Sequence, residues 1–243
     1  MDCAVVNMDR DKARWEKVHE MLTKAKIRHR RFAAVDGKKM GAEYDHLMVP
    51  GTRRFAPSGA VGNALSHYLV LEEFLQSKNE VCLVLEDDAL MAEGAVDHLK
   101  LILAVAPEGW DMIKLSSQPF NYEGPTILFK FTYTYDYVAR LVSREGARKL
   151  VAQKIAWPCH ADTTFWLIPN LNVYVVNKKY PTFYQTWETT SLSGARYPSW
   201  YMNLKVVKTE EVDWMVGDLM VGLVLVVVVG NLFKKAYGLK GKF

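Results

Sequence analysis

Three consecutive acids, Glu86, Asp87 and Asp88, are the residues of this chain with the clearest chemical potential. They follow residues 81–85, a continuously apolar run that predicts a strand buried on both faces. In open α/β sheets, ligands bind beyond the carboxyl ends of such strands. Three carboxylates there repel one another unless a cation offsets them, and hard oxygen ligands favour Mg²⁺ or Mn²⁺, often together with phosphates. The alternative is a solvated acidic turn that only ends the strand.

Composition indicates one folded domain and argues against nucleic-acid binding. The 243 residues are 50% hydrophobic, enough for a substantial core. The net charge of +4 is concentrated in residues 215–243, which hold four lysines and one acid, so the body is nearly neutral and gives no reason to expect a nucleic-acid partner. The three cysteines, Cys3, Cys82 and Cys159, lack metal-ligand spacing and are interpreted as buried thiols of a reducing compartment. No signal peptide is visible, so we expect a cytoplasmic location.

Strand and helix patterns alternate along the body of the chain. Alternation of this kind favours an α/β fold, with a mostly parallel central sheet and helices on both of its faces. Asp9, Ser58 and Ser143 are expected to cap helices. We expect strands at residues 3–7, 31–37, 81–86, 110–115, 132–142 and 173–176, helices at 9–25, 58–76, 93–105, 144–151 and 162–167, and an irregular connection at 38–57.

The C-terminal segment is expected to be separate from the catalytic body. Residues 219–229 are all apolar or glycine, and Lys234 and Lys235 follow. A membrane-spanning helix needs about 20 apolar residues, a length reached here only if Asp218 and Asn231 are included. We therefore divide the chain into a domain at 1–214 and a tail at 215–243. The tail is expected to associate with a membrane, peripherally or as a tail anchor, and a buried element packed on the body is the alternative.

Several blocks of the chain together resemble glycosyltransferase family 25, the family of lipooligosaccharide and collagen galactosyltransferases. Asn63 stands where the family usually has cysteine, and the resemblance covers about residues 4–195. The blocks that carry it are Val5 to Arg10, Ala34 to Gly37, Gly59 to His67, Leu83 to Ala89, Asp111 to Leu115, Ser143 to Leu150 and Pro158 to Asp162.

The resemblance implies a GT-A architecture, meaning one Rossmann-like domain with a nucleotide half and an acceptor half. It implies a UDP-sugar donor, most often UDP-galactose or UDP-glucose, an Mn²⁺ or Mg²⁺ cofactor, and inversion at the anomeric carbon. A glycan or glycoprotein is the implied acceptor, as in lipopolysaccharide biosynthesis. Within the acidic motif, Asp88 is the expected principal metal ligand. Glu86 is expected to face the donor and is a second candidate ligand, and Asp87 to support the loop or contact the sugar.

Two further groups of residues are candidates for donor binding. Asn7 and Asp9, at the carboxyl end of the first strand, would lie near the base and ribose, although Asp9 could only cap its helix. Arg10 and Arg14, one helical turn apart, could meet phosphate, although surface arginines are usually just solvated.

Three other positions each have a structural alternative. Ser66 and His67 lie mid-helix in a matched block, where His67 could contact the donor or satisfy a core hydrogen bond. Lys114 lies in an apolar strand, where an unpaired ammonium is costly, so a carboxylate or phosphate partner is expected, with a purely structural salt bridge as the alternative. Alternating tyrosines could form an acceptor-stacking wall or pack the sheet: Tyr133, Tyr135 and Tyr137.

The general base must come from downstream of the metal strand. Asp162 is the first candidate, although it could also cap a short helix, and Glu188 is its competitor. His160 is a candidate metal ligand or acceptor contact.

Two rival functions stay open. A metal-dependent nucleotidyltransferase should have a Gly-rich loop after its first strand, which residues 8–11 are not; a non-catalytic, membrane-tethered binding module is the second rival.

Overall fold

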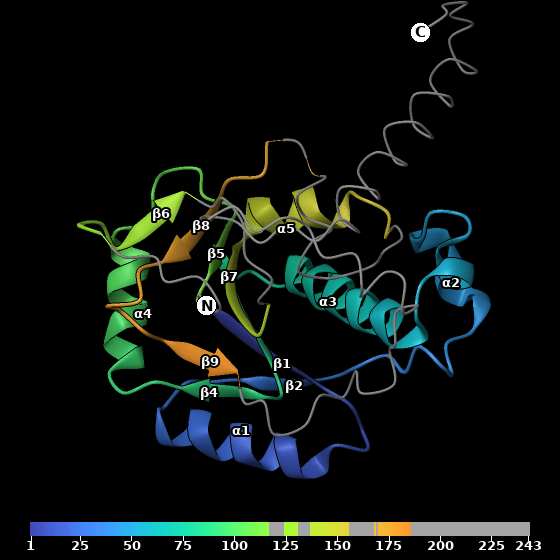
Figure 1. The fold of residues 1–243 in the computed structure, drawn as a ribbon, viewed down its shortest axis with the longest axis horizontal. Helices are drawn as coiled ribbons and strands as arrows, with labels where there is room; N and C mark the ends of the chain where they lie inside the picture. The colour runs from blue at the N-terminus through green and yellow to red at the C-terminus, as the bar shows by residue number, and fades with distance from the viewer. Residues whose placement is uncertain (117–123, 131–136, 156–167, 169, 186–243) are drawn as a thin grey trace, which may run out of the picture. The chain divides into compact units, whose positions relative to one another are not determined.

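A computed structural model describes residues 1–116, 124–130, 137–155, 168 and 170–185 (Figure 1). A seven-stranded sheet has the order β2-β1-β3-β7-β5-β8-β6, and β4 pairs with β9 in a second, two-stranded sheet. The elements are β1 (Asp2–Asn7), α1 (Lys12–Lys24), β2 (Arg30–Ala33), a 3₁₀ helix η1 (Ala42–Leu47), α2 (Thr52–Phe55), α3 (Ser58–Gln76), β3 (Val81–Glu86), β4 (Ala89–Met91), α4 (Ala95–Ala104), β5 (Met112–Lys114), β6 (Leu128–Lys130), β7 (Ala139–Ser143), α5 (Arg144–Val151), β8 (Val173–Val176) and β9 (Phe183–Gln185).

The large sheet is mostly parallel, which confirms the predicted α/β fold class. Strands β2, β1, β3, β5 and β8 run in one direction, and β7 and β6 run against them. The central strands are apolar on both faces because helices cover both. In β3, for example, Cys82 to Leu85 are completely buried.

Two pairs of helices cover the two faces of this sheet. Helices α1 and α4 pack on one face, where Val18, Leu22 and Ile102 join the core cluster that contains Leu83 and Leu85. Helices α3 and α5 pack on the other face, in a cluster with the alternate residues of the same strand. Figure 1 shows α1 and α3 on opposite sides of β1. Each residue of a central strand therefore faces one helix pair or the other, and this alternation decides where the polar side chains at the strand ends point.

One edge of the sheet collects the ends of several strands. The carboxyl ends of β1, β3 and β5 lie at the same edge because these strands are parallel. Strand β7 runs the other way, so it begins at this edge, and the nitrogen of Glu86 donates to the carbonyl of Val138 at 2.8 Å. Asn7, Glu86, Lys114 and Tyr137 thus come to one side of the molecule, as the switch-point rule requires of a ligand site.

Some predicted elements and caps were wrong in detail. Residues 38–57 contain η1 and α2 and are not wholly irregular. Asp9 does not cap α1, which begins at Lys12 with Asp11 in the cap position, and Ser58 is already helical after Pro57. The Ser143 cap is confirmed, because its hydroxyl accepts a hydrogen bond from the nitrogen of Gly146 at 2.9 Å. Strands β4, β6 and β9 were not predicted.

The predicted tail, residues 215–243, lies outside the described residues, as does the predicted helix at 162–167. In the part of the chain that the structure describes, none of the helices has the length and apolar character needed to cross a bilayer.

Candidate active site

The three acids at the end of β3 point toward three different elements. Glu86 continues the alternation of Cys82 and Val84 and therefore faces α3. Asp87 turns toward the end of β1 and toward α1. Asp88 turns toward β9, where its Oδ2 accepts a hydrogen bond from Nε2 of Gln185 at 2.9 Å. Each of the three carboxylates thus has its own hydrogen-bond partners, on α3, at the end of β1 or on β9.

Glu86 is held from α3 by two donors. Its Oε1 lies 2.9 Å from Nε2 of His67 and accepts from Nδ2 of Asn63 at 3.2 Å. These two α3 residues are four apart, so they lie on the same face of the helix. Behind them, Nη2 of Arg140 lies 2.7 Å from Nδ1 of His67. Arg140 is completely buried in β7, and its guanidinium stacks 3.6 Å from the ring centroid of Tyr137.

The charge states of His67 and Glu86 in this series of hydrogen bonds can be assigned. Burial and the neighbouring Arg140 guanidinium lower the pKa of His67 to about 4, although Glu86 opposes the shift. Burial disfavours the charged form of Glu86, but the hydrogen bonds from His67 and Asn63, with the charge of Arg140, outweigh it and lower the pKa of Glu86. At neutral pH, His67 is therefore neutral and Glu86 is ionised. Their contact is a hydrogen bond to a carboxylate and not an ion pair.

Asp87 connects the ends of β1 and β3 to α1. Its Oδ2 accepts from Nδ2 of Asn7 at 2.7 Å and its Oδ1 from Nη1 of Arg14 at 3.1 Å. Burial raises the pKa of Asp87, and these two donors offset only part of that effect. Arg14 therefore meets a carboxylate in this structure, and Asp87 is tied to the end of β1 and to α1.

Asn7 is the centre of a second network at the end of β1. It is only 1% exposed, and its Oδ1 accepts from Nε of Arg31 at 2.7 Å. The same guanidinium reaches Oδ1 of Asp9 at 2.7 Å, while the Asp9 side chain is 81% exposed. Arg10 is also exposed, and its Nη1 lies 3.6 Å from Oδ2 of Asp36. Asp9 and Arg10 are thus at the open margin of the site, whereas Asn7 is part of its internal frame.

Asp88 has the electrostatics expected of a ligand for a cation. Burial, followed by the charges of Glu86 and Asp87, raises the pKa of Asp88 to about 7, although Gln185 and Arg14 oppose the shift. A divalent ion beside Asp88 would replace the proton that this environment favours. The described residues hold no cluster of three or more His, Cys, Asp or Glu side chains arranged for a metal. Asp88 could contribute one carboxylate to a cation site, and phosphates commonly supply further ligands to Mg²⁺ in such sites.

A tight backbone junction fixes α3 against the sheet. The Oγ of Ser66 donates to the carbonyl of Gly62 at 2.6 Å and accepts from the nitrogen of Val35 at 2.8 Å. A Cβ on Gly62 would lie 2.5 Å from the carbonyl oxygen of Val35, and a Cβ on Gly37 would overlap the carbonyl of Ser58. Ser66 is completely buried, so its role here is to position the helix that presents Asn63 and His67.

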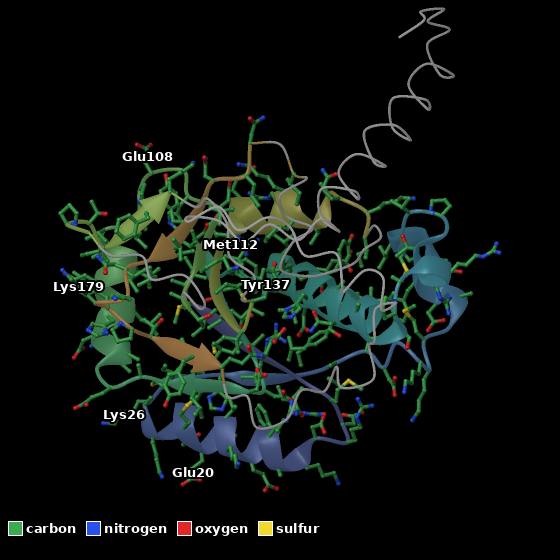
Figure 2. All side chains as sticks on the ribbon, viewed as in Figure 1. Glu20, Lys26, Glu108, Met112, Tyr137 and Lys179 are labelled. Atoms are coloured by element: carbon green, nitrogen blue, oxygen red, sulfur yellow. The ribbon has the colours of Figure 1, made fainter. Side chains whose placement is uncertain are left out.

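The interior behind Glu86 is built from charged and aromatic groups. Lys114 is completely buried and lies directly opposite Arg140 in the β5–β7 pairing. The Tyr137 ring packs edge-on against His67, with centroids 5.2 Å apart. Figure 2 shows Tyr137 and Met112 inside the fold, whereas Glu20 of α1 and Lys26, which follows that helix, are exposed. Of the two interpretations of Tyr137, packing is the one that these contacts support.

Sequence reasoning missed Arg140 and Gln185. Arg140 carries the signal that singled out Lys114, a charged residue inside an apolar strand, and could have been found in this way. Gln185 has no comparable signal, because its position depends on the pairing of Ala89 with Gln185 across 96 residues. Several predicted residues lie outside the described ones and stay predictions: Tyr133, Tyr135, His160, Asp162 and Glu188.

The model of glycosyltransferase family 25 (LPS biosynthesis protein) matches residues 1–134 of this chain. A glycosyltransferase 25 family member of Anopheles gambiae is 28% identical over 169 residues, and human procollagen galactosyltransferase 2 is 26% identical over 166 residues. The probable inactive glycosyltransferase 25 family member 3 of Bos taurus is 28% identical over 168 residues. The matches cover 60–62% of this chain and only 26–28% of these relatives.

Among solved structures, a glycosyltransferase involved in the glycosylation of the major capsid of PBCV-1 is similar over 78% of this chain and 95% of that chain, with 9% identity and a TM-score of 0.47. The family model covers residues 1–134, which include the acidic triplet, the Asn63–His67 face of α3 and the junction at Gly62. This chain belongs to glycosyltransferase family 25.

Proposed function

We propose that the chain transfers a hexose, galactose or glucose, from a UDP-sugar to a hydroxyl of a glycan or glycoprotein acceptor, with a divalent metal ion and with inversion at the anomeric carbon. Membership of glycosyltransferase family 25 supports a glycosyltransferase. The observation that carries the proposal is the divergence of the three acids at the carboxyl end of β3. Glu86 is an ionised carboxylate that α3 holds in place, and Asp88 is a carboxylate whose surroundings favour a positively charged partner.

Glu86 is suited to accept hydrogen bonds from sugar or ribose hydroxyls. It is ionised, its side chain is 22% exposed, and its Oε1 is fixed by His67 and Asn63. A carboxylate that is locked in place before the donor arrives does not lose side-chain freedom when it binds. In this role Glu86 orients the donor, and Asp87 keeps the loop in position through Asn7 and Arg14.

Asp88 is the residue that would hold Mn²⁺ or Mg²⁺, together with the phosphates of the donor. A bound divalent ion would supply neutralisation of the charge that develops on the departing diphosphate. Because a ligand carboxylate must be deprotonated and the pKa of Asp88 is about 7, metal affinity should fall as the pH drops below neutrality. Glu86 and His160 stay as proposed additional ligands.

Inversion requires a carboxylate that removes the proton of the acceptor hydroxyl on the face opposite the leaving diphosphate. We propose Asp162 for this role, with Glu188 as the competitor. A membrane contact through residues 215–243, peripheral or as a tail anchor, and a cytoplasmic location complete the proposal. It does not include a nucleic-acid partner.

A non-catalytic binding module is the second candidate, because similar relatives of Bos taurus and Rattus norvegicus are named as probable inactive family members. Isothermal titration of UDP into the full chain, with and without Mn²⁺, tests the binding half of the proposal. We expect UDP affinity to rise with Mn²⁺ in the wild type and to be insensitive to Mn²⁺ in Asp88→Asn. Absence of metal-linked UDP binding in the wild type would contradict the proposal. Metal-linked binding with no UDP release from any UDP-hexose, over a panel of acceptors, would favour the binding module.

A further inference from the structure

A buried chain of three side chains runs from β7 to the acidic motif. It begins at Arg140, passes through His67 and ends at Glu86. Arg140 is completely buried and His67 is 4% exposed, so water is largely excluded from both contacts. Each contact is short, 2.7 Å from Nη2 to Nδ1 and 2.9 Å from Nε2 to Oε1. The order of these groups determines the position of every proton in the chain.

The first contact fixes which nitrogen of His67 carries the proton. Arginine is always protonated in proteins and has only donors, so Nη2 must donate and Nδ1 of His67 must accept. The neutral imidazole then carries its proton on Nε2. That nitrogen faces Oε1 of Glu86, which as a carboxylate can only accept. The other tautomer would set an N–H against a guanidinium and a lone pair against a carboxylate.

The guanidinium itself is held by the strand from which it comes. Nη1 donates to the carbonyl of Tyr137 at 3.3 Å, and the Tyr137 ring lies 3.6 Å from the guanidinium carbon. In the sheet, Arg140 is flanked by Val84 of β3 and by Lys114 of β5. Arg140 is therefore oriented by β7 before any ligand is present, and it does not contact Glu86 in any described hydrogen bond.

We propose that Arg140 is a positioning residue: by donating to Nδ1 of His67 it forces His67 to donate to Glu86, and it thereby orients the Glu86 carboxylate toward the sugar-nucleotide donor. The inference rests on the proposed function for the identity of the ligand, but the tautomer does not. Asn63 supplies the second donor to the same oxygen, so Oε1 is fully engaged from α3. The carboxylate can then rotate very little, which leaves its other oxygen to meet a hydroxyl of the donor.

The test combines two measurements on the full chain. The first is the tautomer of His67 in the free protein, from the ¹⁵N chemical shifts of the labelled imidazole, assigned among the six histidines with His67→Gln. The second is the KM for the UDP-hexose beside kcat. The variants are Arg140→Met, which removes the donor, and Arg140→Lys, which keeps a charged donor. Arg144→Met is the matched control, because this half-buried arginine donates to carbonyls at the end of α3 and not to the site.

We expect the Nε2–H tautomer in the wild type, in Arg140→Lys and in Arg144→Met, and its partial or complete loss in Arg140→Met. The donor KM of Arg140→Met should rise about 10–100-fold, the usual effect of losing a residue that orients a ligand-binding group, with a smaller change in kcat and with rescue by lysine. An Nδ1–H tautomer in the wild type or in folded Arg140→Lys would overturn the inference. So would a folded Arg140→Met that keeps both the tautomer and the donor KM.

If Arg140→Met does not fold, an Nδ1–H tautomer in the wild type or in folded Arg140→Lys would still overturn the inference. Failure of the proposed function has a different signature. A wild type that neither binds UDP nor releases it from a UDP-hexose would defeat the proposed function, while the tautomer would still report whether Arg140 controls His67.

Discussion

The side-chain amide of Asn7 and the carboxylate of Asp87 are joined at 2.7 Å across 80 residues of sequence. Asn7 ends β1 and Asp87 follows β3, and these two strands are parallel neighbours in the sheet. Arg14 holds the other oxygen of Asp87 from α1. Asp87, the middle acid of the triplet, therefore connects the end of β1 to α1. Its neighbours Glu86 and Asp88 instead bond to α3 and β9.

Replacement of Asn7 by aspartate should be strongly destabilising. It removes the amide donor to Asp87 and places a second carboxylate beside it, in a position that is 1% exposed. A buried acceptor that loses its donor costs about 1–3 kcal/mol, and repulsion adds to this above the pKa values of the two acids. Chemical denaturation of Asn7→Asp should show a loss of at least about 2 kcal/mol at pH 8 and a smaller loss at pH 4.

The exposed Asp9→Asn is the control and should change the free energy of unfolding by less than about 0.5 kcal/mol. Equal effects of the two substitutions would mean that Asn7 is not part of the internal frame.

Asp88→Asn should make the protein more stable at neutral pH while it removes the proposed metal ligand. Burial and the charge of Glu86 raise the folded-state pKa of Asp88 to about 7, from an ordinary value of 3.8. Between these values the folded chain keeps a proton that the unfolded chain has lost. This contribution to stability is therefore present below pH 3.8 and is lost as the pH rises through 7. Asparagine does not titrate, so Asp88→Asn does not lose stability over this pH range as the wild type does.

The difference between Asp88→Asn and the wild type should grow from pH 4 to pH 8, to the order of 2 kcal/mol in the absence of metal. Urea denaturation at both pH values measures it. A difference that is constant with pH would show that Asp88 titrates normally in the folded chain.

Gly62→Ala tests the junction that places α3. The added methyl group would lie 2.5 Å from the carbonyl oxygen of Val35, which is backbone and cannot move independently. Overpacking of this kind costs about 1–3 kcal/mol and should displace Asn63 and His67 from Glu86. We expect a lower melting temperature together with weaker UDP binding in the folded fraction.

Gly41→Ala provides the comparison for this substitution, because there the atoms nearest to the new methyl group belong to the side chain of Glu43, which can move away. Equal stability of the two variants would contradict a tight junction at Gly62.

The sequence was sufficient for the strands whose environment is uniform. Residues 81–86 and 173–176 were predicted as strands and are β3 and β8, because an apolar run without polar interruption has only one way to be buried in a sheet of this kind. The spacing of apolar residues over 58–76 correctly predicted a helix, but it could not separate the roles of Ser66 and His67. Ser66 turns to the backbone of Val35 and His67 to Glu86, a difference of one residue and about 100° around the helix.

The remaining parts of the site depend on long-range pairing, which a local pattern does not encode. Gln185 reaches Asp88 only because β9 pairs with β4, and both strands have three residues, too few to show a periodic pattern. Arg140 reaches His67 because β7 runs against β3 and begins at the edge where β3 ends. A direction of pairing of this kind cannot be read from the residues of either strand alone.

Asp162→Asn tests the proposed base. Loss of a general base typically lowers the rate about 10²–10⁴-fold, so kcat should fall by that factor while UDP affinity is preserved. Steady-state transfer and UDP titration on the same preparation provide the two quantities. Normal turnover of Asp162→Asn, with a large fall in Glu188→Gln, would move the role to Glu188.

The most direct test of the central claim is UDP release from UDP-galactose and UDP-glucose, measured with and without Mn²⁺ for the wild type and Asp88→Asn. Loss of an interaction that stabilises the leaving diphosphate by several kcal/mol corresponds to a rate lower by roughly 10²-fold or more. We predict acceptor-dependent, Mn²⁺-dependent release by the wild type and a loss of that size in the folded variant. Wild-type turnover by Asp88→Asn at saturating Mn²⁺, or wild-type release that is indifferent to metal, would contradict the account.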